Sequence, residues 1–306
     1  MLPIVFNIII ILFFPFLFLG WIHRVKAMWS GRVGVPFLQP WWDFIKLLHK
    51  ERVISHSASW IFQISPVLIA AALMTGVLVL PMVNKSTLIS FDGDFLVFAY
   101  LYSLAKYFQI LMALDTGSSF EGMGASREAS YTALIEPAFF IIIASVAYVS
   151  GFRSFQQVVM LLDIKTQWVL AVNILIVLAL FIMMIVEGCR VPVDDPNTHL
   201  ELTMIHEVMI LDNSGPDLAL LQYAAGLKML MPGILIANFL IPLELGLVLN
   251  LILFISFLFM EATLIGLIES LMARIRLKLI PEFVLMMFSF ALIVLAMLII
   301  YQGGIV

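Results

Sequence analysis

Six ionisable side chains lie within, or at the edge of, long apolar runs of the sequence: Lys106, Glu136, Glu187, Lys228, Glu244 and Glu261. A charge that faces lipid is costly, so such side chains usually pair with one another or face water inside a helix bundle. Burial favours the protonated carboxyl and a nearby cation favours the carboxylate, so a series of Glu residues with an occasional Lys can bind and release protons near neutral pH. The pattern is therefore typical of proton transfer, and structural ion pairs are the alternative.

The segment 187–217 is rich in acidic residues. It holds one arginine, Arg190, and seven carboxylates: Glu187, Asp194, Asp195, Glu201, Glu207, Asp212 and Asp217. Carboxylates are mostly exposed in proteins, so we expect most of the seven to face solvent. Glu187 differs, because it ends an apolar run and an ionised group there must be paired or must face water inside the bundle.

Other motifs that could carry chemistry fail on spacing. His206 and Glu207 begin a His-Glu pair, but Ile210 occupies the position where a zinc protease has its second histidine. The single cysteine, Cys189, can form no disulfide within the chain and cannot supply the several thiolates of an iron–sulfur cluster. No glycine-rich phosphate loop follows a strand pattern, and no Ser or Cys has a base partner in the sequence. We therefore expect neither a metal site nor a catalytic centre in this chain.

The composition indicates which solvent surrounds these residues. Of the 306 residues, 63% are hydrophobic and 12% are charged, whereas a soluble domain is nearer half apolar and a quarter charged. The net charge of −4 is small and of the wrong sign for a nucleic-acid-binding protein. These values exclude an ordinary soluble globule and favour a protein of the lipid bilayer.

The apolar runs are long enough to cross a bilayer, which takes about 20 residues of helix. Lipid offers the backbone no hydrogen-bond partners, so the runs are expected to be helices. Eight are predicted, at Leu2–Trp21, Ile61–Val83, Phe95–Leu114, Leu134–Val149, Trp168–Val186, Leu218–Ile241, Leu245–Gly266 and Phe283–Tyr301. The first run lacks the basic start and small-residue cleavage site of a signal peptide, so we interpret it as a span. The sequence thus predicts an all-α integral membrane protein with a single transmembrane domain over residues 1–306.

The connections between the predicted spans differ in charge. If the connection after the first span is cytoplasmic, eleven Lys and Arg residues lie on that side: Arg24, Lys26, Arg32, Lys46, Lys50, Arg52, Arg127, Arg190, Arg274, Arg276 and Lys278. The other side then holds only Lys85, Arg153 and Lys165. This asymmetry follows the positive-inside rule. With an even number of spans, both termini are predicted to lie outside the cytoplasm.

A short amphipathic pattern occupies the first cytoplasmic connection. Between Gln39 and Arg52, aromatic and aliphatic residues alternate with charged ones at helical spacing. A helix lying in the membrane interface would place Trp41 and Trp42 at headgroup depth and its cations toward phosphate or water. This helix is either a surface anchor or the roof of a site shared with a soluble partner.

The same segment carries a family resemblance. It resembles the first cytoplasmic loop of the heel subunit of respiratory complex I, through the motifs Gly31-Arg32-Val33-Gly34, Leu38-Gln39-Pro40 and Asp43-x-x-Lys46-Leu47-Leu48-x-Lys50-Glu51. That family includes the membrane subunits of energy-converting nickel–iron hydrogenases and formate hydrogenlyases.

Two later blocks extend the resemblance. The residues from Leu114 to Phe120 and from Gly124 to Ala129 look like the hydrogenase branch, with Arg127 and Glu136 at the arginine and glutamate of two complex I motifs, Leu-Arg-Ala-Ala and Ser-Tyr-Glu. The third block is similar to the loop that lines the quinone cavity of complex I, through the pattern Glu187-x-x-Arg190-x-Pro192-x-Asp194-x-Pro196 and then Glu201-Leu202. Departures from that loop at Asn197, His199 and Asn213 replace two carboxylates and a tyrosine.

The resemblance implies roles for several residues. Members of the family form an eight-helix membrane platform on which a hydrophilic redox arm docks. By analogy, the arm would meet Arg32, Asp43, Lys46, Arg127 and Arg190. The proton path would consist of Glu136, Glu187, Asp194, Glu201 and Lys228.

The resemblance also implies partners and a place in the cell. The chain would hold no cofactor of its own and would lie in the inner membrane of a prokaryote, in contact with lipid. Hydrogenase-like small and large subunits and an iron–sulfur subunit would hold iron–sulfur clusters and, where it is retained, a nickel–iron centre; antiporter-like membrane subunits would lie alongside. The leading interpretation is a non-catalytic membrane subunit that docks the redox arm and couples electron transfer to the translocation of protons or sodium ions.

Two alternatives are left open. A quinone-binding heel subunit of a complex I-like NADH dehydrogenase would need a headgroup site, and the departures at Asn197, His199 and Asn213 speak against it. A stand-alone secondary transporter often has inverted repeats and broken helices around a midplane site. The sequence contains no such repeat.

Overall fold

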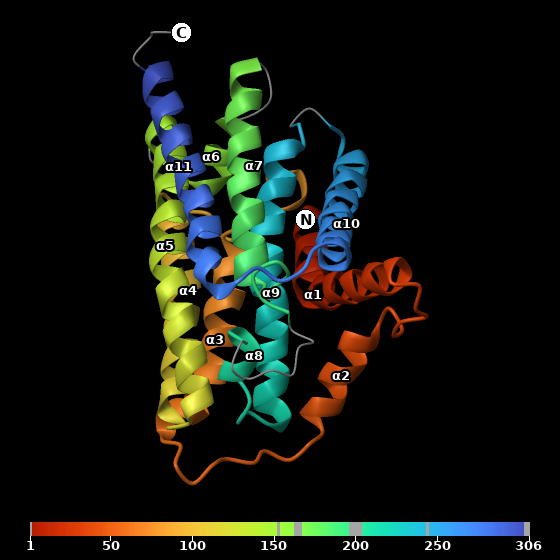
Figure 1. Ribbon diagram of the computed structural model, residues 1–306. Helices are drawn as coiled ribbons and strands as arrows, with labels where there is room; N and C mark the ends of the chain where they lie inside the picture. Colours follow the sequence, from red (N-terminus) through yellow and green to blue (C-terminus); the bar gives the residue numbers. More distant parts are fainter. Residues whose placement is uncertain (1, 152–153, 162–166, 196–203, 243–244, 303–306) are drawn as a thin grey trace.

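Long helices dominate the structure, a computed structural model that describes residues 2–151, 154–161, 167–195, 204–242 and 245–302 (Figure 1). Eight of them are long and apolar enough to cross a membrane. They are α1 (Leu2–Trp29), α3 (Trp60–Leu78), α4 (Asp94–Asp115), α5 (Ser119–Ser150), α7 (Gln167–Glu187), α9 (Gly215–Leu240), α10 (Leu247–Leu271) and α11 (Ile280–Gln302). The described residues contain no β-strand. The prediction of an all-α membrane protein with eight spans is confirmed.

Short helices connect the spans in the described part of the chain: α2 (Gln39–Leu48), η1 (Val83–Lys85), α6 (Phe155–Leu161), α8 (His206–Met209) and η2 (Leu277–Leu279). The predicted amphipathic helix is α2, which has Pro40 in its first turn, where a backbone N–H has no partner within the helix. None of its residues is buried. It packs on α1 and α9 and lies toward the lower end of the bundle in Figure 1, together with α8. We call this the α2 end; it is the side predicted to be cytoplasmic.

The helix α9 lies at the centre of the bundle. It packs against α1, α2, α3, α7 and α10, and most of its residues are buried. A helix that is surrounded by protein must be apolar on every side or must pair its charges. Lys228, which is 3% exposed on α9, is such a charge.

The helix α5 begins at Ser119, well before the predicted start of this span at Leu134. The segment that was expected to be a loop is helical. Its first turns carry glycine and polar residues, so they lack the apolar run by which a span is recognised. Gly124 lets these turns approach α8, because a β-carbon there would collide with the side chain of Val208. The extension brings Glu128 into the interior of the bundle.

Asp115, the last residue of α4, fixes the start of α3. Its carboxylate accepts hydrogen bonds from the backbone N–H groups of Ser59 (2.8 Å) and Phe62 (3.1 Å) and from the Ser59 hydroxyl (2.7 Å). Ser59 itself caps α3 by accepting from the N–H of Ile61 at 3.2 Å. The first N–H groups of a helix have no partner within it, so this carboxylate stabilises the junction of the two helices.

We expect Asp115→Ala to destabilise the protein, because it removes a charged acceptor from a helix start, at a cost of about 2 kcal/mol. The melting temperature in detergent, followed by tryptophan fluorescence, should fall by several degrees. Asp212→Ala, at an exposed carboxylate, is the matched control and should leave it unchanged. Equal melting temperatures for the two variants would contradict the capping role.

Candidate functional site

Four charged side chains from four helices meet inside the bundle: Lys106 of α4, Glu128 of α5, Glu187 of α7 and Lys228 of α9. Each is at most 5% exposed. Glu187 forms ion pairs with both lysines, and its Oε2 lies 3.0 Å from Lys228 Nζ. Glu128 Oε1 lies 3.5 Å from Lys228 Nζ and 3.9 Å from Lys106 Nζ. We call these four residues the four-charge cluster.

The four-charge cluster balances two cations against two anions. Buried ions are tolerated only when they are paired, and removing one partner leaves an uncompensated charge. Lys106 Nζ also donates to Thr132 Oγ1 at 3.0 Å. Because each lysine lies close to both carboxylates, a proton added to either carboxylate leaves a positive charge that the other three groups share. The arrangement can therefore accept or pass a proton without isolating any charge.

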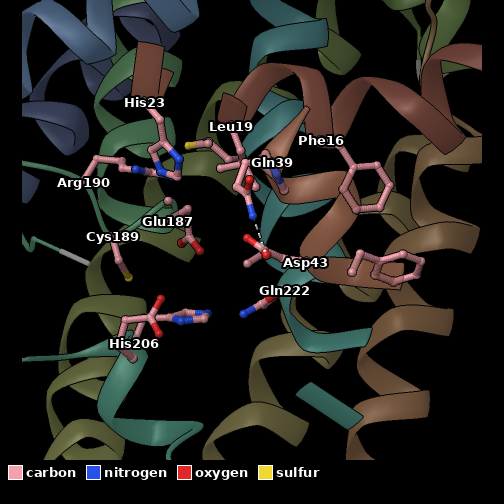
Figure 2. A pocket seen from close by; sticks show the side chains of 16 residues that line it. Phe16, Leu19, His23, Gln39, Asp43, Glu187, Cys189, Arg190, His206 and Gln222 are labelled. Atoms are coloured by element: carbon pink, nitrogen blue, oxygen red, sulfur yellow. Dashed lines mark hydrogen bonds between the residues drawn. The ribbon is translucent and has the colours of Figure 1, made fainter. Parts of the chain in front are cut away.

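A cavity of about 270 Å³ adjoins the cluster, between α1, α2, α9 and the segment that follows α7. Its polar lining consists of His23, Gln39, Asp43, Glu187, Arg190, His206, Glu207 and Gln222. Figure 2 shows Asp43, Glu187 and His206 arranged around the same space, with the hydrogen bond from Gln39 Nε2 to Asp43 Oδ1 (2.8 Å) drawn as a dashed line. Glu187 belongs to both the cavity and the cluster, so the cavity gives access to the buried ion pairs.

The cavity groups outside the spans have shifted proton affinities. Burial lowers the pKa of His206 to about 3, so its imidazole is neutral at pH 7. Burial raises the pKa of the Glu207 carboxyl and of the Cys189 thiol. A neutral imidazole donates through one nitrogen and accepts through the other, so His206 can relay a proton beside Glu187 without becoming a stable cation.

The described residues contain no group of three or more His, Cys, Asp or Glu side chains that could hold a metal ion.

Glu136, a predicted member of the proton path, lies apart from the cluster. It is partly exposed and lines a groove of about 730 Å³ between α4 and α5. Lys106 and Thr132 line the same groove. Glu136 and Glu187, both predicted members of the proton path, therefore occupy different places, with Lys106 between the groove and the cluster.

Asp194, also assigned to the proton path, organises the segment that follows α7. Its carboxylate accepts hydrogen bonds from the N–H groups of Asp195 (2.9 Å) and Ile205 (2.8 Å) and pairs with Arg274 Nη2 at 3.0 Å. Burial raises its pKa, against the opposing effects of Arg274 and these hydrogen bonds. Glu201, the next predicted member of the path, lies outside the described residues.

The acidic segment is less exposed than expected. Asp194 is 1% exposed and Asp217 is 6% exposed, so the expectation that such carboxylates face solvent is wrong for both. Asp212 is exposed as expected. The reason lies in distant cations: Arg274 pairs with Asp194, and Arg52 pairs with Asp217. Spacing within the segment carries no information about these partners.

The predicted docking residues of the first connection lie at the α2 end. Arg32 and Lys46 are exposed. Asp43, on the same helix as Lys46, faces the cavity (Figure 2). The helix α2 thus presents one side to the cavity and another to the outside.

Two further predicted docking residues are engaged within the protein. Arg190 is 5% exposed, and its Nη1 lies 3.2 Å from Glu269 Oε1. Arg127 Nη1 donates to the carbonyl of Met204 at 2.8 Å, which ties α5 to the segment that carries α8. Both arginines therefore hold segments around the cavity in place.

The structure adds functional candidates that the sequence did not single out, above all Glu128 and Thr132. Glu128 lies four residues before Thr132 and eight before Glu136, a spacing that brings the three to one broad face of a helix. This signal depends on α5 starting as early as Ser119, which the apolar pattern does not show.

Comparison with known proteins shows which family this chain resembles. The family model described as NADH dehydrogenase matches residues 2–301. Formate hydrogenlyase subunit 4 of Escherichia coli K12 is 30% identical over 284 residues, which cover 89% of this chain and 91% of that protein. Hydrogenase-4 component C of the same organism is 28% identical over 233 residues, 76% of this chain and 73% of that protein. One subunit of the NADH-quinone oxidoreductase of Methylococcus capsulatus is 25% identical over 191 residues, 60% of each chain.

A solved structure has the same fold. A chain of the membrane-bound sulfane sulfur reductase, an archaeal respiratory membrane complex, matches with a TM-score of 0.81 at 19% identity, over 97% of this chain and 98% of that one. The resemblance that the three sequence blocks indicated is confirmed by the family match over nearly the whole chain. This chain belongs to the NADH dehydrogenase subunit 1 family of membrane proteins.

Proposed function

We propose that this chain is the non-catalytic membrane subunit on which the redox arm of an energy-converting, hydrogenase-type complex docks, and that it couples electron transfer in that arm to ion translocation. Hydrogenase-like small and large subunits and an iron–sulfur subunit would form the arm, and antiporter-like membrane subunits would lie beside the chain. The observation that carries the proposal is the four-charge cluster, whose Glu187 also lines a cavity at the α2 end.

The cluster supplies a physical means of coupling. In low-dielectric surroundings a charge acts strongly over several ångströms, so a change of charge or of position at the cavity alters the balance between Glu187 and its two lysines. Protonation of Glu187 would free Lys106 and Lys228 from one of their two counter-charges. Each redox event that alters the cavity could thus drive one proton into or out of the cluster.

The order of groups supports a direction for the transfer. Asp43 and His206 line the cavity on the side of the predicted docking face. Glu187 follows, and Lys106 extends from the cluster to the groove that holds Glu136. Protons would pass from the cavity through Glu187 toward Glu136. Asp194 would shape the approach, because it fixes the segment that bears His206.

The exposed cation on α2 offers a test of docking. Lys46→Glu should weaken binding of the redox arm, because it places a negative charge on the predicted contact surface while disturbing no interior contact. The amount of arm subunits that co-purify with the tagged chain in gentle detergent should fall, while the level of the chain in the membrane stays the same.

Lys278→Glu is the matched control, since Lys278 is also exposed and lies on the predicted cytoplasmic side but outside the first connection. Equal recovery of the arm in the two variants would make the docking role of α2 untenable.

A second candidate function has its own structural support. An apolar groove of about 500 Å³ shares Phe16 and Phe44 with the polar cavity. A quinone could place its apolar tail in the groove and its headgroup in the cavity, which is the arrangement that the complex I alternative requires. Solvent extraction of the purified complex tests this: a quinone in stoichiometric amount supports it, and full activity in quinone-free membranes contradicts it.

A further inference from the structure

Glu261 is a buried carboxyl that the four-charge cluster does not include. It lies on α10, is 1% exposed, and neither of its carboxyl oxygens has a hydrogen-bond partner among the described residues. Ten residues separate it from the helix end at Leu271, about 15 Å at the rise of an α-helix. The carboxyl therefore lies deep within the span.

Gly233 of α9 provides the space that this carboxyl occupies. A β-carbon at position 233 would collide with Glu261 Oε2. Glycine inside a helix is unfavourable compared with alanine, because it loses more conformational freedom on folding. The backbone of Gly233 is not left-handed, so its conformation does not call for glycine. The close contact with Glu261 is what requires glycine at position 233.

No ion pair balances Glu261 within the described chain. Lys228, the cation of the neighbouring α9, pairs with Glu187 at 3.0 Å. Lys26 of α1 pairs with Glu269, two turns further along α10, at 3.3 Å. An ionised carboxylate without a counter-ion is strongly disfavoured inside a membrane protein. The space beside Gly233 that the carboxyl occupies, which we call the seat, therefore suits the neutral acid.

The remaining charged and titratable groups of the elements that pack on α10 have partners or positions away from Glu261. His23 of α1 lines the cavity. Arg24 of α1 donates to the carbonyl of Val33 at 2.9 Å. Lys85 belongs to η1, which packs on α10 at the end where Asn84 N–H donates to Asn250 Oδ1 (2.7 Å), far from the α2 end. Asp217 lies at the start of α9, paired with Arg52. The Tyr223 hydroxyl of α9 donates to the carbonyl of Ile11 at 2.9 Å.

The helix α9 connects this carboxyl with the four-charge cluster. Lys228 and Gly233 are five residues apart, about 7.5 Å along the helix axis. Pro232 lies between them and has no N–H for the carbonyl of Lys228, which accepts instead from the Tyr102 hydroxyl at 3.2 Å. Helices bend at such points. A bend here would change the Lys228 ion pairs and the Gly233 contact together.

We propose that Glu261 is a second proton-binding site of this subunit, filled and emptied during turnover. While it is seated against Gly233 it is a neutral acid. When α9 bends at Pro232 and opens the seat, the carboxyl oxygen gives its proton to a water molecule that enters, and the carboxylate takes a proton back as the seat closes. This inference rests on the proposed function, because the change of charge at Glu187, which alters the ion pairs of Lys228, is what would move α9.

Infrared difference spectroscopy on the intact detergent-purified complex tests the site. The spectrum of the reduced minus the oxidised complex should contain a carbonyl-stretch band of the protonated Glu261 carboxyl, in addition to any band that Glu187 contributes. Glu261→Gln should abolish this band, whereas Glu282→Gln, at an exposed carboxylate at the start of α11, should retain it. Gly233→Ala keeps the carboxyl but places a methyl group in the space that it occupies, so it should shift the frequency of the band. This variant provides the test if Glu261→Gln does not assemble.

The outcomes separate this inference from the proposed function. A band that persists unchanged in Glu261→Gln and Gly233→Ala, or no band in the parent complex, overturns the second site. Ion translocation per electron in Glu187→Gln tests the proposed function independently, since that measurement does not involve Glu261. Loss of translocation in Glu187→Gln together with an unchanged band in Glu261→Gln would leave the function standing and remove the inference.

Discussion

Replacing Lys228 with methionine is expected to destabilise the chain, and adding Glu128→Gln to that variant is expected to restore its stability. Lys228→Met leaves Glu128 and Glu187 with one lysine between them. An uncompensated buried charge costs about 3–5 kcal/mol, a large share of the stability of a protein. The double variant removes one charge of each sign and keeps the pair of Glu187 with Lys106.

Melting temperature and yield of monodisperse protein in detergent measure this effect for both single variants and for the double variant. The non-additivity of the three values reports the coupling between Lys228 and Glu128. Lys278→Met, at an exposed lysine, controls for the loss of a cation as such. A double variant that is no more stable than Lys228→Met would show that charge balance does not hold the cluster together.

Glu187→Gln is expected to uncouple the complex. Glutamine keeps the size and hydrogen bonding of the side chain but cannot carry a proton, and Glu187 is the only cluster member that also lines the cavity, within the described residues. The variant leaves one uncompensated charge and should melt at a lower temperature than the parent. In complexes that assemble, electron transfer from the donor to an artificial acceptor should stay near the parent rate, because the proposed function places the redox centres in the arm. Ion translocation per electron in proteoliposomes should be lost.

The matched control for that variant is Asp212→Asn, in the same acidic segment but exposed. It should translocate ions at the parent ratio. If Glu187→Gln assembles and also translocates at the parent ratio, the cluster is a structural ion-pair network and the proposed coupling is incorrect.

The spans were predictable because each is a local property of the chain. Uninterrupted apolar runs such as Trp168–Val186 coincide closely with a helix, here α7 (Gln167–Glu187), since lipid requires both the length and the helical conformation. The start of α5 was not predictable in this way. Its first turns at Ser119 pack on α8 through Gly124, and a contact with a distant segment leaves no apolar run in the sequence.

The individual residues of the candidate site could be predicted from the sequence more readily than the ion pairs among them. Glu187 and Lys228 were recognised because an ionisable residue in an apolar run is costly and is therefore usually paired or functional. Glu128, which pairs with Lys228 and Lys106, was missed, because it lies on the part of α5 that was expected to be a loop. Glu136, predicted as a member of the same proton path as Glu187, lies on the groove side of α5. Which charges meet depends on how four helices pack, and no single segment encodes that.

The proteins that co-purify with this chain distinguish a subunit of a redox complex from a protein that acts alone. We expect the tagged chain, extracted from its own membranes in gentle detergent, to carry hydrogenase-like and iron–sulfur subunits in fixed stoichiometry, with iron detected by elemental analysis. Mass spectrometry of the purified sample measures this. A stable, monodisperse chain without redox subunits, able to move ions by itself after reconstitution, would exclude a docking subunit and identify a stand-alone transporter instead.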